Sequence, residues 1–130
     1  MKKNVLIVDD SDLNLYIYKR FLSSLSPACE LLTTDCGTKA LDIISQRKID
    51  LILTDICMPG MSGYELIKII RSTEEVFNED RRIKIIILSA YCDRGSQLPL
   101  WDEQILIPVE KNVLIDRVEE NLGLPLTQIL

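Results

Sequence analysis

Five short apolar runs recur along the chain and constrain its fold more than any other feature. They are VLIV (5–8), ELLTT (30–34), LILT (51–54), IIIL (85–88) and ILI (105–107). Four of them are continuously apolar rather than alternating, which is typical of parallel strands covered by helices on both faces. The intervals between them mostly have helical periodicity. The sequence therefore predicts an α/β fold, a doubly wound five-stranded parallel sheet of the (βα)5 type.

Local signals predict where several helices begin and end. Ser62 and Glu65 have the spacing of a capping box, so a helix should begin at Ser62. Asn112 is expected to cap the last helix and Gly123 to end it. In the first helix, Leu13, Ile17, Phe21 and Ser24 are expected to share one face.

Two stretches carry weaker signals. The segment CDRGSQLPLWDEQ (92–104) contains Gly95 and Pro99 and has little periodicity, so a fourth helix there should be short or irregular. The segment EEVFNEDRR (74–82) lengthens the preceding connection, and we interpret it as a solvated loop. No repeat or internal linker is found, so a single domain is expected, with a core of about residues 4–122 and a tail at 123–130.

Composition narrows the possible functions. The chain has 130 residues and a net charge of −5 without a basic block, which argues against nucleic acid as a direct partner. No apolar run is long enough to span a bilayer and no signal peptide is indicated, so we expect a cytoplasmic protein without a membrane partner. The four cysteines are expected to be reduced thiols. With no histidine in the chain, any chemistry must use carboxylates, hydroxyls, lysines and a hard metal ion.

Acidic residues follow two of the predicted strands. Asp9 and Asp10 come after 5–8, Asp55 after 51–54, and Ser89 after 85–88. Ligands bind at the carboxyl ends of strands in such sheets, so three carboxylates should meet at one edge. A lone aspartate after a strand is usually a turn residue or helix cap, and Asp12 is interpreted in that way. An all-oxygen site suits Mg²⁺, and Asp55 beside a metal is suited to act as a nucleophile toward a phosphoryl donor.

These residues also carry a resemblance to a known family. VLIVDDSDLN, LILTDICMPGMSGYEL and IIILSA resemble the first, third and fourth strands of response-regulator receiver domains, the CheY-like phosphoaspartate modules of two-component signalling. The resemblance covers about residues 4–122. It implies a flavodoxin-like sheet with strand order 2-1-3-4-5 and a signalling module rather than an enzyme.

The resemblance also implies roles for individual residues. Asp55 would accept a phosphoryl group from a histidine kinase or a phosphotransfer protein. Mg²⁺ would be held by Asp10, Asp55 and the main-chain carbonyl of Cys57, with Asp9 binding directly or through water. Ser89 would hydrogen-bond a phosphoryl oxygen. Output would pass through contacts with a downstream protein.

The chain departs from the family pattern around its fifth strand. Aligning Pro108 with the family proline places Ile107 where receivers usually have a lysine, and Gln104 where they usually have an aromatic residue. Either Lys111 reaches back toward the carboxylates or it is a solvated residue at the start of the last helix, and we favour the second. Phosphorylation should then be slow, or poorly coupled to the surface that contacts the downstream protein. Replacing Ile107 with lysine should raise the rate of phosphorylation.

Two other functions remain to be weighed. The missing lysine and Gln104 favour a degenerate receiver that acts as a phosphorylation-independent interaction module. The complete acidic set and Ser89 favour phosphorylation. The D-x-D of DDSDLN also occurs in haloacid-dehalogenase-like phosphatases, but that interpretation leaves the segment TDICMPGMSG unexplained.

Overall fold

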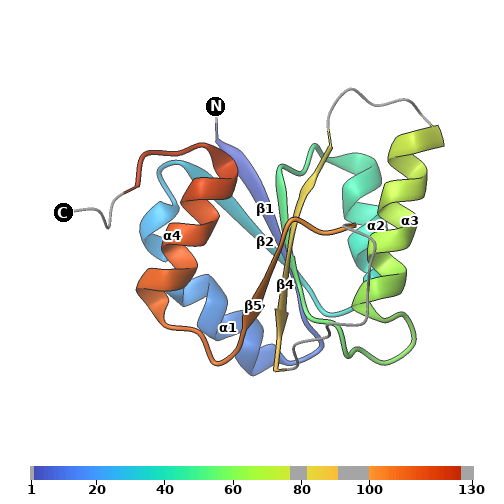
Figure 1. Ribbon diagram of the computed structural model, residues 1–130, viewed down its shortest axis with the longest axis horizontal. Coiled ribbons are helices and arrows are strands. Elements are labelled where there is room, and N and C mark those ends of the chain that lie inside the picture. Colours follow the sequence, from blue (N-terminus) through green and yellow to red (C-terminus); the bar gives the residue numbers. More distant parts are fainter. Residues whose placement is uncertain (1, 77–81, 91–99, 127–130) are drawn as a thin grey trace.

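A computed structural model describes residues 2–76, 82–90 and 100–126. It contains five strands, four α-helices and a short 3-10 helix within these residues (Figure 1). In chain order they are β1 (Lys3–Val8), α1 (Asp12–Phe21), the 3-10 helix (Ser23–Leu25), β2 (Cys29–Thr34), α2 (Gly37–Gln46), β3 (Leu51–Thr54), α3 (Gly63–Val76), β4 (Lys84–Ser89), β5 (Glu103–Leu106) and α4 (Lys111–Leu122).

The strands form one parallel sheet, as the apolar runs predicted, in the order β2-β1-β3-β4-β5, which the resemblance implied. Helices α1 and α4 cover one face, and α2 and α3 cover the other (Figure 1). The central strands are apolar on both faces because each face packs against a helical layer. Val5 and Ile7 belong to the core under α1 and α4, whereas Leu6 and Val8 belong to the core under α2 and α3. None of the described helices is long and apolar enough to cross a membrane.

The helix ends confirm two of the local predictions and correct a third. The Ser62 hydroxyl accepts a hydrogen bond from the Glu65 N–H at 3.2 Å, as a capping residue should. Gly123 ends α4 in the left-handed conformation, with φ of 68°. The prediction for Asn112 was wrong: Glu110 is the capping residue of α4 and Asn112 lies inside the helix. The expected fourth helix falls largely on residues 91–99, which lie outside the described part of the chain.

The first helix is rotated from the expected orientation. Leu13 is 67% exposed, whereas Tyr18 and Leu22 are buried against the sheet. Ile17 and Phe21 are only partly buried at the margin of the same core. The helix therefore turns a tyrosine, rather than Leu13, toward the interior.

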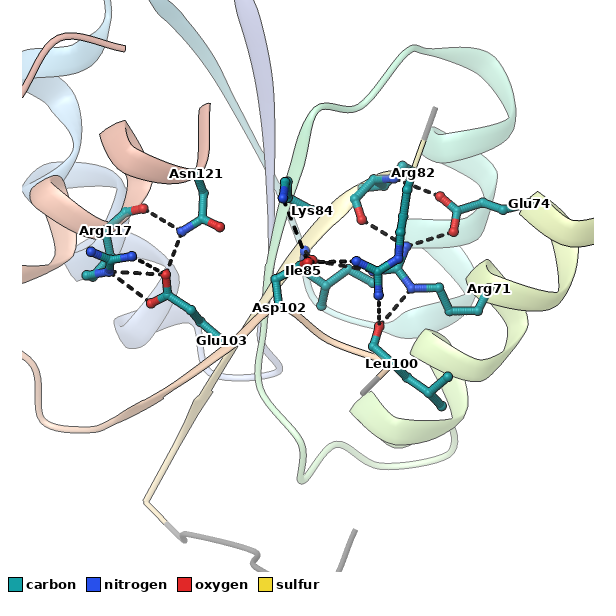
Figure 2. Close-up of polar contacts among 11 residues, drawn as sticks. Arg71, Glu74, Arg82, Lys84, Ile85, Leu100, Asp102, Glu103, Arg117 and Asn121 are labelled. Atoms are coloured by element: carbon teal, nitrogen blue, oxygen red, sulfur yellow. Dashed lines mark hydrogen bonds and ion pairs between the residues drawn. The ribbon is translucent and has the colours of Figure 1, made fainter. Parts of the chain in front are cut away.

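A buried group of charged side chains ties the segment before β5 to α3 and β4 (Figure 2). We call Arg71, Glu74 and Asp102 the arginine clamp. The side chain of Arg71 lies 2.7 Å from Glu74 through Nη1 and 3.5 Å from Asp102 through Nη2. The three side chains are only 11%, 12% and 15% exposed. Arg82 adds a second cation, with its Nη1 2.7 Å from Asp102 Oδ1.

Main-chain groups supply further hydrogen bonds to the arginine clamp (Figure 2). Among the described residues, Arg71 Nη2 remains a buried atom without a hydrogen-bond partner. Arg71 donates to the carbonyl oxygens of Leu100 and Ile83 at 2.7 and 2.8 Å. The carboxylate of Glu74 accepts from the Ile83 N–H at 2.7 Å, and that of Asp102 accepts from the Ile85 N–H at 2.8 Å. Glu74 and Arg82 fall in the stretch that we interpreted as a solvated loop. That interpretation was wrong for Glu74, which lies in α3 and belongs to the clamp. Arg82 is exposed, as the interpretation expected, although it pairs with Asp102.

Candidate functional site

Three carboxylates meet at the carboxyl edge of the sheet. Asp9 and Asp10 follow β1 and Asp55 follows β3. One oxygen from each side chain can be chosen so that all three lie within 4.8 Å of one another. The arrangement is the one that the strand ends predicted, and we call these three residues the acidic cluster.

Strand register explains why the acidic cluster forms. Val8 and Thr54 are partners in the parallel pairing of β1 and β3, so both strands end at the same level. The Asp55 N–H continues this ladder by donating to the Val8 carbonyl at 3.0 Å, and the Asp9 N–H donates to the Thr34 carbonyl at 3.2 Å. The two side chains consequently leave neighbouring strands side by side.

Asp9 is the most buried member of the acidic cluster, with 2% of its surface exposed. Burial raises the pKa of its carboxyl above the ordinary value, and the charges of Asp55 and Asp10 raise it further. Hydrogen bonds from the Ser11 N–H at 2.9 Å and the Asn14 Nδ2 at 3.2 Å partly offset this effect. The carboxylate is therefore held in place in a setting that disfavours its charge.

Asp55 is half-buried, and burial is the largest cause of its raised pKa, with a smaller contribution from Asp10. Its Oδ1 accepts a hydrogen bond from the Ile56 N–H at 2.8 Å. Within the described residues, no lysine or arginine forms an ion pair with any member of the acidic cluster. Three clustered oxygen ligands without a protein cation suit a hard divalent ion such as Mg²⁺.

Gly63 fixes the main chain of the loop that follows Asp55. Its N–H donates to the Ile56 carbonyl at 2.8 Å, which brings the start of α3 against the residue after Asp55. A Cβ atom at this position would lie 2.1 Å from the Asp55 carbonyl oxygen, far inside van der Waals contact. Only glycine fits here, so the loop that orients Asp55 is packed directly on the helix that follows it.

The remaining predicted residues lie around this edge. Ser89 ends β4 and is 2% exposed, and its carbonyl accepts a hydrogen bond from the Ile107 N–H at 3.0 Å. Cys57 is an exposed free cysteine in the loop after Asp55. The peptide bond between Ile107 and Pro108 is cis.

The position of the usual lysine is occupied by an apolar side chain. Ile107 packs against the core under α1 and α4. Lys111 is exposed as the first residue of α4, and it forms no ion pair within the described part of the chain. Gln104 lies in β5 and is partly buried.

Two residues near the acidic cluster were not singled out from the sequence. Asn14 binds Asp9, and its signal was a polar residue in the first turn of a helix that begins just after the acidic pair. Tyr18 lies one turn further on, and its pKa is raised by burial and by the charges of Asp9 and Asp55. No local pattern distinguishes it from the exposed Tyr16.

Comparison with known proteins settles the family. A family model described as the response regulator receiver domain matches residues 5–120. The chain belongs to this family. Receivers are the signalling domains of two-component response regulators and are not enzymes in the ordinary sense.

Two curated relatives illustrate the range of lengths in which the receiver occurs. The polar-differentiation response regulator DivK of Brucella ovis is 33% identical over 127 residues, which cover 95% of this chain and 98% of the relative. Stress response regulator protein 1 of Debaryomyces hansenii is 37% identical over 91 residues, which cover 70% of this chain but only 37% of that protein.

Solved receiver structures share the fold. A CheY-like receiver domain from Methylobacillus flagellatus superposes with a TM-score of 0.79 at 24% identity, covering 93% of this chain and 99% of that one. The response regulator protein TrrA from Thermotoga maritima, in complex with Mg(2+)-BeF, gives a TM-score of 0.77 at 30% identity, covering 92% and 99%.

Proposed function

We propose that this receiver accepts a phosphoryl group on Asp55. The observation that carries the proposal is the acidic cluster, with three carboxylate oxygens within 4.8 Å and no protein cation paired with them among the described residues. A half-buried carboxylate in this setting is a competent oxygen nucleophile once its charge is balanced. Asp9, Asp10, Asp55 and the Cys57 carbonyl would hold Mg²⁺, which when bound offsets negative charge on the carboxylates and on the entering phosphoryl group.

The donor is a phosphohistidine on a histidine kinase or phosphotransfer protein, and the output is contact with a downstream protein. A carboxylate oxygen of Asp55 forms a bond to phosphorus while the P–N bond of the donor breaks, and the electron pair stays with the imidazole. Asp55 is held for this step by the ladder bond to Val8, the hydrogen bond from Ile56 and the contact with Gly63. The Ser89 hydroxyl donates a hydrogen bond to a phosphoryl oxygen and keeps its proton.

A phosphorylation-independent interaction module is the second candidate. It is favoured by Ile107, whose apolar side chain packs into the core where receivers usually place a lysine. Because Lys111 is exposed and forms no ion pair with the acidic cluster, nothing in the described chain restores the missing charge.

The two candidates predict different results with a small phosphodonor. The wild-type protein and Asp55→Asn are incubated with Mg²⁺ and acetyl phosphate, and intact masses are recorded over time. A single phosphoryl adduct on wild type alone supports the acceptor function. If no adduct forms with acetyl phosphate or with a phosphorylated histidine phosphotransfer protein, although Mg²⁺ binds, the interaction module is favoured.

A further inference from the structure

A pocket of about 640 Å³ lies between α2 and α3, away from the acidic cluster. The two helices lie side by side on one face of the sheet (Figure 1). The pocket is lined by the C-terminal parts of both helices and by the segments that lead into β3 and β4, so it lies at the opposite edge of the sheet from the carboxylates. Its volume is within the range of roughly 300 to 1,000 Å³ that is typical of small-molecule sites.

The apolar walls of the pocket are aliphatic. Five side chains form them, two from α2, one from α3 and one before each of β3 and β4: Leu41, Ile44, Ile70, Ile49 and Ile83. No aromatic ring is present among the described lining residues, so a flat aromatic ligand would find no ring to stack on. An aliphatic chain would gain the burial of its apolar surface against these walls. The walls therefore favour a ligand with an aliphatic body.

Hydrogen bonds hold both sides of the pocket in place. On one side, the carboxylate of Glu74 accepts from the Ile83 N–H at 2.7 Å, and Arg71 donates to the Ile83 carbonyl at 2.8 Å. On the other side, the Asn4 Nδ2 donates to the Lys48 carbonyl at 2.7 Å, which ties the turn after α2 to β1. A pocket whose walls are already fixed spends little of its binding free energy on ordering them.

The two hydroxyl groups of the pocket already use their protons. The Ser45 hydroxyl donates to the Asp42 carbonyl at 2.6 Å, and the Thr73 hydroxyl donates to the Ile69 carbonyl at 2.8 Å. Each of these hydrogen bonds lies within a single helix. Neither hydroxyl is therefore available as a donor unless it gives up a bond to its own helix.

The charged groups of the pocket differ in whether they have a partner. Glu74 lies 2.7 Å from Arg71, and Arg47 lies 2.7 Å from Glu30. Lys48 is exposed, and its ammonium group forms no ion pair with any described residue. The charge that remains for a ligand is therefore a single positive one at the rim of an apolar pocket. This arrangement is complementary to an aliphatic molecule that carries one negative group.

We propose that this pocket binds a small aliphatic carboxylate, of the chemical class of a free medium-chain fatty acid. The aliphatic chain lies between α2 and α3, and the carboxylate pairs with the ammonium group of Lys48. The proposal follows from the volume of the pocket, its aliphatic walls and the one unpaired cation at its rim. It is independent of phosphorylation at Asp55, because the pocket shares no residue with the acidic cluster.

Three probes with the same ten-carbon chain test the class of ligand. Decanoate, decan-1-ol and decyltrimethylammonium are titrated separately into the whole protein below their micelle-forming concentrations, and amide NMR spectra are recorded. We expect decanoate to shift the signals of pocket residues saturably, decan-1-ol to bind more weakly, and the cation to bind least. If decanoate gives no saturable shift at these residues, or if the cation binds as tightly, the proposal is overturned.

Lys48→Gln tests the ion pair while keeping the main-chain carbonyl that binds Asn4. It should weaken decanoate binding roughly fivefold, as the loss of an exposed ion pair allows, and leave decan-1-ol binding unchanged. Salt should weaken decanoate binding to wild type but not to this variant. Lys68→Gln is the matched control, since Lys68 is an exposed lysine of α3 outside the pocket lining. Equal affinities of the two variants for decanoate would refute the ion pair.

Thr73→Trp tests the place of binding. Thr73 is exposed at the pocket, so a bulky ring there should obstruct the space between the helices without disturbing the core. We expect both decanoate and decan-1-ol to lose binding, with a thermal midpoint close to that of wild type. A folded variant that binds decanoate as wild type does would place the ligand elsewhere. Sedimentation of the wild-type protein with phosphatidylglycerol vesicles would indicate a membrane lipid instead, and would overturn the proposal of a free acid.

Discussion

The two ends of the sheet treat buried charge in opposite ways. At the carboxyl edge, Asp9, Asp10 and Asp55 gather like charges without a described protein cation, and the pKa values of Asp9 and Asp55 are raised. At the amino end, the arginine clamp pairs each buried carboxylate with arginine and with main-chain N–H groups. Both ends bury carboxylates, but only the clamp supplies their partners from within the chain.

The difference distinguishes a structural group of charges from the site that we propose to bind Mg²⁺. Unpaired buried charge lowers the stability of a fold, so the acidic cluster should destabilise the metal-free protein. A bound cation would remove this destabilisation. The clamp bears no such cost, and its contacts hold the segment before β5 in place. Matched substitutions at the two ends should therefore have effects of opposite sign.

The largest effect is expected at the arginine clamp. Arg71→Met keeps much of the aliphatic volume but leaves Glu74 and Asp102 without their shared cation. Removing one partner of a buried ion pair should lower the free energy of unfolding by about 3 kcal/mol. Chemical denaturation is the measurement, and Lys68→Met, at an exposed position of the same helix, is the control. A loss no larger than in the control would mean that the clamp is not structural.

At the acidic cluster, replacing a charge should stabilise the metal-free protein. Because the folded-state pKa of Asp9 is raised above 3.8, its ionised form at neutral pH opposes folding, and stability should rise as pH falls through that raised pKa. Asp9→Asn removes this penalty, so we expect the metal-free variant to be more stable than wild type at neutral pH.

The same variant should lose its response to Mg²⁺. At a concentration of about 100 times Kd, Mg²⁺ should stabilise wild type by about 2.7 kcal/mol, and Asp9→Asn by much less. Thermal denaturation with and without Mg²⁺ gives both quantities, with the exposed Asp12→Asn as the control. If Asp9→Asn destabilises the metal-free protein, the contrast between the two ends is refuted.

The smallest effect is expected at an ion pair that is more exposed than the arginine clamp. It tests whether burial determines how much an ion pair contributes to the free energy of unfolding. Glu103 of β5 pairs with Arg117 of α4 as in the clamp, but their side chains are 26% and 33% exposed. The hydrogen bond from Arg117 is the largest cause that lowers the pKa of Glu103 below 4.5. We expect Glu103→Gln to cost up to about 1 kcal/mol at neutral pH.

The sign of the pH dependence follows from the lowered pKa. The stability contributed by Glu103 is present above 4.5 and is lost as pH falls through the folded-state pKa. The difference between wild type and Glu103→Gln should therefore close in acid, whereas Glu75→Gln, at an exposed position, should show little difference at any pH. If the difference in stability between wild type and Glu103→Gln instead grew in acid, Arg117 would not be stabilising the charged carboxylate of Glu103.

The acidic cluster could be predicted from the sequence because its three residues come directly after predicted strands. Neighbouring parallel strands finish at one edge, so residues directly after VLIV and LILT had to meet. The arginine clamp could not be predicted in this way. Arg71 and Leu100 are 29 residues apart, and no pattern of apolar residues or caps indicates that their segments touch. Glu74 and Arg82, placed in a charged stretch, were interpreted as solvated for the same reason.

Helix rotation marks a second limit of the sequence. The apolar spacing of Leu13, Ile17 and Phe21 favoured one face of α1, yet Tyr18 and Leu22 are the residues buried against the sheet. Periodicity ranks side chains by polarity, so it undervalues a tyrosine that buries its ring.

The ring pair at the clamp has a practical consequence. Trp101 is the only tryptophan of the chain, and its ring lies 5.4 Å from that of Tyr64 at the start of α3, between two residues held by the arginine clamp. Its intrinsic fluorescence is therefore a built-in reporter of the contact between the segment before β5 and the start of α3. Because Gly63, the neighbour of Tyr64, packs on the Asp55 carbonyl, a change in emission on adding Mg²⁺ or a phosphodonor would be an optical readout of changes in the loop after Asp55, without any attached dye.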